Sequence, residues 1–134
     1  MSSLVKLLGA VAIVAVSFLG TLWVIDRFAL FGVPCPSGDT INFALPLPAY
    51  GKVGYQFDAP SLTGVANGPG ALTRSRYLLC ENGTLLGPGN SDLGDIGTKG
   101  QGRFNHWMSS FYFSASDNTN PNNNSRTYRA VRPQ

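Results

Sequence analysis

The chain has 134 residues, and only 13% of them are charged, against about 25% in an average soluble domain. Its formal net charge of +3 is too small to indicate a nucleic-acid-binding protein. One His and two Cys leave little material for a metal site built by the protein itself. We therefore expect no cofactor, no metal and no nucleic-acid partner.

The first predicted element is an apolar run over residues 4–27, which we interpret as a transmembrane anchor helix. Its apolar part, residues 4–25 (LVKLLGAVAIVAVSFLGTLWVI), has the roughly 20 residues that a helix needs to cross a bilayer. A cleaved signal peptide is the alternative, but its apolar core is about 7–15 residues long and precedes a small-residue cleavage site. No such site follows Trp23. Lys6 favours residues 1–3 as a cytoplasmic tip, with the rest of the chain outside.

Small residues recur on one face of this predicted helix, at spacings of three and four. They are Gly9, Ala12, Val16 and Gly20. Small side chains let a second transmembrane helix approach closely. This helix-packing face indicates other membrane-protein subunits, in addition to the lipid bilayer, as partners of the anchor.

After a predicted linker over residues 28–39, residues 40–134 have the character of a single β domain. Short alternating or aromatic runs are separated by Gly, Pro and Asn, which is typical of an antiparallel sandwich or small barrel with about six or seven strands. The Asn82-Gly83 pair predicts a type I′ hairpin turn. No helical periodicity stands out after the anchor, and residues 59–71 and 92–102 are predicted to be loops. The expected strands cover residues 40–45, 52–57, 74–80, 84–86, 103–107, 110–114 and 126–131.

The two cysteines, Cys35 and Cys80, are expected to form a disulfide, because the domain is placed outside the cytoplasm. The alternative is a pair of buried thiols. A bridge across roughly 45 residues would contribute about 4 kcal/mol by the loop-entropy argument.

Polar and aromatic residues of the second half form a candidate ligand or partner surface. Planar amides, a carboxylate and an Arg suit saccharide hydroxyls, and an aromatic ring suits a sugar face. The alternative is that the Asx side chains cap their own backbone in a long turn. The predicted surface consists of His106, Trp107, Asp117, Asn118, Asn120 and Arg126.

Catalysis is not expected, because His106 has no recognisable nucleophile motif around it. An envelope-saccharide enzyme would have to use Asp92, Asp95 and Asp117 as its acids. A calcium site in the Asn-rich loop is a further alternative, although Asp117 is the only carboxylate within residues 116–125.

Residues 77–128 resemble a β-rich module of bacterial cell-envelope proteins that have no established activity, some of them encoded near cell-surface polysaccharide genes. The resemblance implies a bacterial envelope setting and a shared β module, and it assigns no catalytic residue. This chain departs from the pattern near Arg126, where Asn124 and Ser125 precede a single Arg. The matching stretches are residues 79–89 (LCENGTLLGPG), 102–107 (GRFNHW), 113–121 (FSASDNTNP) and 126–128 (RTY).

Together these features predict a non-enzymatic, single-pass accessory subunit of the bacterial inner membrane. Its β domain would pack on the periplasmic face of a larger membrane complex. The alternative function is a membrane-tethered module that binds an envelope saccharide.

Overall fold

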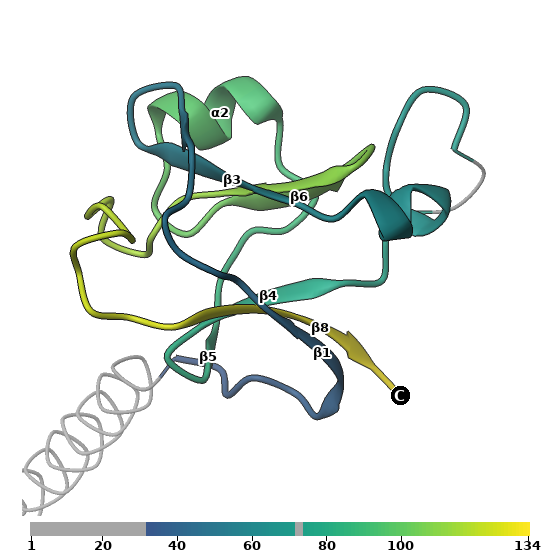
Figure 1. Ribbon diagram of the computed structural model, residues 1–134, viewed down its shortest axis with the longest axis horizontal. Helices are drawn as coiled ribbons and strands as arrows, with labels where there is room; N and C mark the ends of the chain where they lie inside the picture. The colour runs from purple at the N-terminus through teal and green to yellow at the C-terminus, as the bar shows by residue number, and fades with distance from the viewer. Residues whose placement is uncertain (1–31, 72–73) are drawn as a thin grey trace, which may run out of the picture. The chain divides into compact units, whose positions relative to one another are not determined.

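The computed structural model describes residues 32–71 and 74–134, in which a compact unit runs from Val33 to Gln134. This unit is an all-β, sandwich-like domain of two antiparallel sheets (Figure 1). Each sheet has four strands, so the described residues contain eight strands where the sequence predicts six or seven. The first sheet has the order β1 (Gly38–Asn42), β8 (Tyr128–Pro133), β4 (Leu78–Glu81), β5 (Thr84–Leu85). The second has the order β2 (Ala49–Tyr50), β3 (Gly54–Asp58), β7 (Ser110–Phe113), β6 (Phe104–Trp107).

The hydrophobic core lies between the two sheets and follows from the period-two alternation of their strands. Phe111 and Phe113 point to the same side of β7 and are at most 1% exposed. Leu79 of β4 and Ala130 of β8 face them from the other sheet and are fully buried. Phe43, which follows β1, stacks on Phe57 of β3 with ring centroids 4.2 Å apart.

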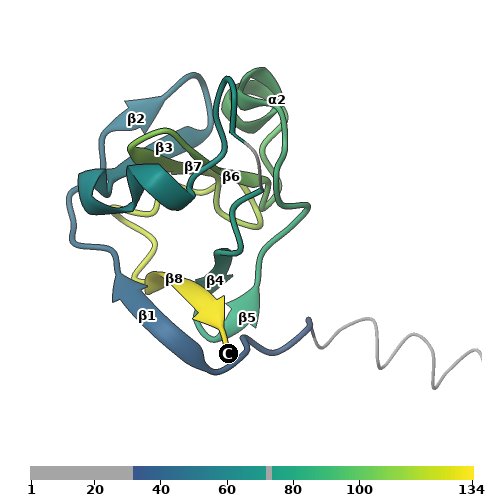
Figure 2. The same cartoon turned by 90° about the vertical axis from the view of Figure 1, so that its right-hand side faces the viewer.

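The β4–β5 hairpin confirms two predictions. Asn82 and Gly83 both have positive φ, 48° and 80°, as a type I′ turn requires. Cys35 and Cys80 form the predicted disulfide, with their Cα atoms 5.9 Å apart. The Cys35 amide also donates to the Gly83 carbonyl at 2.8 Å. This part of the range predicted as a linker is therefore hydrogen-bonded to the hairpin (Figure 2).

The prediction of no helix in the β domain is wrong. The Gly-rich segment forms α2 (Leu93–Thr98), which lies over the outer face of the second sheet, and residues Pro60–Val65 form a 3-10 helix, η1. Ile96 anchors α2 and is fully buried. The Gly97 carbonyl accepts hydrogen bonds from the amides of Lys52 and Val53 at 2.7 and 3.1 Å, so tertiary contacts offset the low helix propensity of glycine.

The strand boundaries differ from prediction most clearly at residues 74–80, because β4 begins only at Leu78. Upstream of it, the Ser75 amide donates to the side chain of Asn67 at 2.8 Å and not to a neighbouring strand. Strand β2, of two residues, was not predicted.

The predicted cytoplasmic tip (residues 1–3), anchor (residues 4–27) and helix-packing face lie outside the described residues. Within residues 32–71 and 74–134, no helix combines the length and the apolar character that crossing a membrane would require. The face in question comprises Gly9, Ala12, Val16 and Gly20.

Candidate functional site

The candidate site is built along β6, the edge strand of the second sheet. One side of β6 pairs with β7, and an edge strand must satisfy its remaining backbone groups elsewhere. The loop after β5 forms the hydrogen bonds of the free backbone groups in the first half of β6. The Phe104 amide donates to the Pro88 carbonyl at 3.2 Å, and the Ser91 amide donates to the Phe104 carbonyl at 3.1 Å. This loop therefore forms one wall beside the strand.

Asn67 satisfies the second half of the β6 edge. Its amide donates to the His106 carbonyl at 2.8 Å, and its carbonyl accepts from the Met108 amide at 2.8 Å. The segment that follows η1 is thereby fixed against β6 as a second wall.

Three asparagine side chains join the two walls. The Asn67 Nδ2 group donates to Oδ1 of Asn90 at 2.7 Å and to Oδ1 of Asn105 at 2.6 Å. The Asn105 Nδ2 group donates to the Ser91 carbonyl at 2.8 Å. Asn105 is 7% exposed, so these bonds hold both loops at a fixed distance from the strand.

Trp107 lies on the same face of β6 as Asn105, because side chains two positions apart in a strand share a face. Two adjoining hollows of about 290 and 400 Å³ share Asn90, Asn105 and Trp107 in their linings. We call them together the Trp107 groove. The smaller hollow is also lined by Asn67, Gly68, Ala71 and Arg74, and the larger by Ser91, Asp92 and Leu93.

The groove contains polar groups that the described residues leave unused. Within residues 32–71 and 74–134, neither Asn90 Nδ2 nor the Trp107 indole N–H donates a hydrogen bond to a protein acceptor. Asp92 uses Oδ1 to cap α2, accepting from the amides of Gly94 and Asp95 at 2.8 and 3.2 Å. Its Oδ2 is left without a described donor. An aromatic face beside a few convergent polar groups is the typical composition of a small-ligand site.

His106 lies beneath this groove and does not reach the surface predicted from the sequence. Its side chain is 1% exposed and stacks on Phe111 at 4.2 Å. Nδ1 lies 2.8 Å from the Ser75 hydroxyl, whereas Nε2 has no partner among the described residues. Burial lowers the pKa of His106 to about 4, so the imidazole is neutral at physiological pH and supports the wall that carries Ser75.

Asp117 and Arg126 contact each other, as members of one site should. Arg126 donates to both carboxylate oxygens of Asp117, at 3.0 and 2.6 Å, and to Glu81 at 3.2 Å. The Tyr128 hydroxyl donates to the same Glu81 at 2.8 Å. Arg126 holds the pKa of Asp117 well below its usual range. Glu81 is only 8% exposed, so this cluster compensates a buried carboxylate and leaves Asp117 little capacity for a calcium ion.

Asn118 and Asn120 are also occupied by the protein's own backbone. Asn118 Oδ1 accepts from the Gln101 amide at 2.6 Å, and its Nδ2 donates to the Lys99 carbonyl at 3.1 Å. Asn120 Oδ1 accepts from the Asn122 amide at 2.9 Å. Asn120 therefore caps the backbone of its own turn, the alternative that the sequence left open, whereas Asn118 joins the loop to the distant segment after α2.

The predicted surface is thus divided between the two ends of the β6–β7 hairpin. Trp107 pairs with Ser110 at the turn, whereas Phe104 pairs with Phe113 at the open end, from which the chain continues to Asp117. Sequence reasoning missed Asn67, Asn90 and Asn105. The sequence could have indicated Asn105, because it lies two residues before Trp107 and therefore on the same face of the strand. Asn67 and Asn90 come from distant segments, and only the fold brings them to Asn105.

Of the acid pair considered from the sequence, only Asp92 lines the groove. Asp92 caps α2, and Asp95 forms an ion pair with Lys99 at 2.9 Å. In the described part of the chain, no three His, Cys, Asp or Glu side chains gather closely enough to hold a metal ion.

The comparisons with known proteins add no family to this geometry. No protein-family model matches the chain, and neither the curated proteins nor the solved structures contain a significant match. The resemblance of residues 77–128 to envelope proteins therefore stays a prediction, and the site must be interpreted from its own chemistry.

Proposed function

We propose that the protein is a non-enzymatic, membrane-tethered module that binds a saccharide of the bacterial envelope in the Trp107 groove. The observation that carries the proposal is one aromatic side chain beside an amide donor and a carboxylate acceptor that the described residues leave unused. A sugar ring offers an apolar face to an indole and hydroxyls to such polar groups. The fixed asparagine bridges reduce the entropy that binding would cost.

Binding without catalysis is supported by the position of the single His. A general base must come within hydrogen-bond distance of the proton it removes, and the His106 side chain is buried beneath the groove. The acid pair Asp92 and Asp95 is engaged by α2 and by Lys99.

Saccharide titration of the full chain tests this function directly. The chain is purified in a detergent whose headgroup contains no sugar, and Trp23→Phe leaves Trp107 as the only indole. Oligosaccharides released from bacterial surface polysaccharide should change the Trp107 fluorescence in a saturable way. A flat response, matched by the absence of heat in calorimetry, would contradict the proposal.

An accessory subunit of a larger membrane complex, which was the first prediction from the sequence, is the second candidate here, and one sequence feature favours it. Gly9, Ala12, Val16 and Gly20 would present a small-residue face to another helix. In this function the periplasmic β domain would pack on the outer face of the complex. Purification of the tagged chain in mild detergent should then recover other subunits, and a lone monomer would contradict it.

A further inference from the structure

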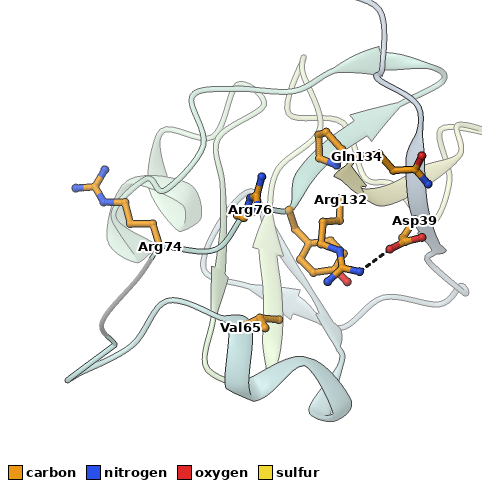
Figure 3. A pocket seen from close by; sticks show the side chains of 8 residues that line it. Asp39, Val65, Arg74, Arg76, Arg132 and Gln134 are labelled. Carbon is orange, nitrogen blue, oxygen red and sulfur yellow. Dashed lines mark hydrogen bonds and ion pairs between the residues drawn. The ribbon is translucent and has the colours of Figure 1, made fainter.

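The charge of the ligand can be inferred from a second cavity next to the Trp107 groove. This cavity has a volume of about 400 Å³ and lies beside the C-terminal end of β8 (Figure 3). We call it the arginine cavity. It is lined by Asp39, Val65, Arg74, Arg76, Tyr77, Arg132, Pro133 and Gln134.

The arginine cavity has more positive than negative charge. Its only acidic side chain, Asp39, is paired with Arg132 at 2.6 Å. Figure 3 shows this pair on one side, with Arg76 beside it and Arg74 extending away from both. Within the described ranges, neither Arg74 nor Arg76 forms an ion pair. In the described residues, these two exposed guanidinium groups are therefore not paired with a carboxylate.

Arg74 connects this charge to the groove, because it lines both the arginine cavity and the smaller hollow beside Trp107. A saccharide chain that stacks on Trp107 and extends past Arg74 would bring its next units against Arg76. Asp92, which would repel an anion, lines the other hollow and is absent from the lining of both cavities that contain Arg74.

We propose that the ligand of the Trp107 groove is an acidic saccharide, whose carboxylate groups are bound by Arg74 and Arg76. This inference rests on the proposed saccharide-binding function and adds its substrate class. The planar guanidinium fork matches a carboxylate in a bidentate manner. Neutral units would occupy the Trp107 end, and acidic units the arginine end.

The test compares two oligosaccharides that differ only in charge. An oligouronate extended at one end by neutral sugar units, and the same oligomer with its carboxyl groups reduced to alcohols, are titrated into the full chain carrying Trp23→Phe. The acidic oligomer should bind about tenfold more tightly, a preference that weakens as ionic strength rises. A sugar phosphate of similar length, used as a third probe, should bind less tightly than the oligouronate.

The double variant Arg74→Gln/Arg76→Gln should bind both oligomers equally. Arg129→Gln is the control for a lost surface charge, because it removes one positive charge from β8 outside the cavity lining, and it should retain the preference. Equal binding of both oligomers by the parent chain would overturn the acidic ligand but leave saccharide binding intact. A preference that survives in the double variant would overturn the assignment to these two arginines. Failure of every oligomer to bind would overturn the proposed function as well.

Discussion

The Asn-rich loop around Asp117 and the Trp107 groove have similar side chains but use them differently. In the loop, Arg126 occupies both oxygens of Asp117, and backbone groups occupy the Asn118 amide. In the groove, the asparagines bond chiefly to one another and leave the amide donor of Asn90 and the Trp107 indole without a described acceptor. Polar composition therefore identifies both regions, whereas the use of each hydrogen-bonding group separates scaffold from binding site.

The largest expected effect is on the stability of the domain, and it comes from a change in the Asp117 loop. Arg126→Met should lower the free energy of unfolding clearly more than its control variant does, because it leaves the Glu81 carboxylate, which is only 8% exposed, without its cation. Chemical denaturation of the full chain measures this loss. Lys99→Met is the control, since its ion pair with Asp95 is largely exposed and should contribute less than about 1 kcal/mol. Similar small losses in both variants would remove the structural role assigned to the Asp117 cluster.

Beneath the groove, His106 should make stability depend on pH. Its pKa falls from 6.5 to about 4 on folding, so the unfolded chain binds a proton first as the pH decreases. The domain should lose about 2 kcal/mol of stability between pH 7 and pH 5, from this group alone.

His106→Phe, which preserves the stacked ring, should reduce the slope of stability against pH over the same range. Denaturation midpoints at several pH values between 7 and 5 measure it. An unchanged slope would show that His106 is not the titrating group. It would contradict a buried, neutral His106 beneath the groove.

On the binding side, Trp107→Ala should weaken saccharide binding about tenfold, close to 1.4 kcal/mol, with a smaller effect on unfolding. Calorimetry is the appropriate measurement, because the variant lacks the fluorescent reporter. Met108→Ala is the control: its side chain is 53% exposed and lies outside the groove lining. Loss of affinity in both variants alike would point to a general disturbance of the hairpin turn.

The smallest effects come from two matched carboxylate changes, which compare the regions directly. Asp92→Asn keeps the N-cap of α2, since Asn caps helices as well as Asp does, and should weaken saccharide binding about fivefold by removing a charged acceptor. Asp117→Asn should leave affinity unchanged and cost less than about 1 kcal/mol of stability, because its side chain is 46% exposed. The reverse order of effects on affinity would favour the site predicted from the sequence.

Local rules were sufficient for most of the β domain. Period-two alternation predicted the strands that supply Phe111 and Phe113 to the core, and the Asn82-Gly83 pair predicted its hairpin turn. The disulfide between Cys35 and Cys80 was predicted because they are the two cysteines of a domain expected outside the cytoplasm, and the structure contains it. Each of these features depends on residues that are neighbours in the chain or, for the disulfide, on the one pair of cysteines.

The remaining features depend on contacts between distant segments. Helix α2 contains Gly94 and Gly97, which local propensity disfavours, and it is stabilised by hydrogen bonds from the β2–β3 turn. Whether an asparagine is a cap or a ligand depends on which backbone groups lie within reach of its amide. For this reason the sequence placed the amides of the site in the Asp117 loop, while Asn67 and Asn90 join Asn105 only in the folded domain.

We propose that the Trp107 groove, and not the Asp117 loop, binds the saccharide. Two-dimensional amide NMR of the full chain with Trp23→Phe, recorded during titration with the oligouronate, tests it most directly. We expect the Trp107 indole and the Asn90 side-chain amide to shift progressively, while the side-chain amides of Asn118 and Asn120 stay in place. Shifts confined to Asn118 and Asn120 would contradict it.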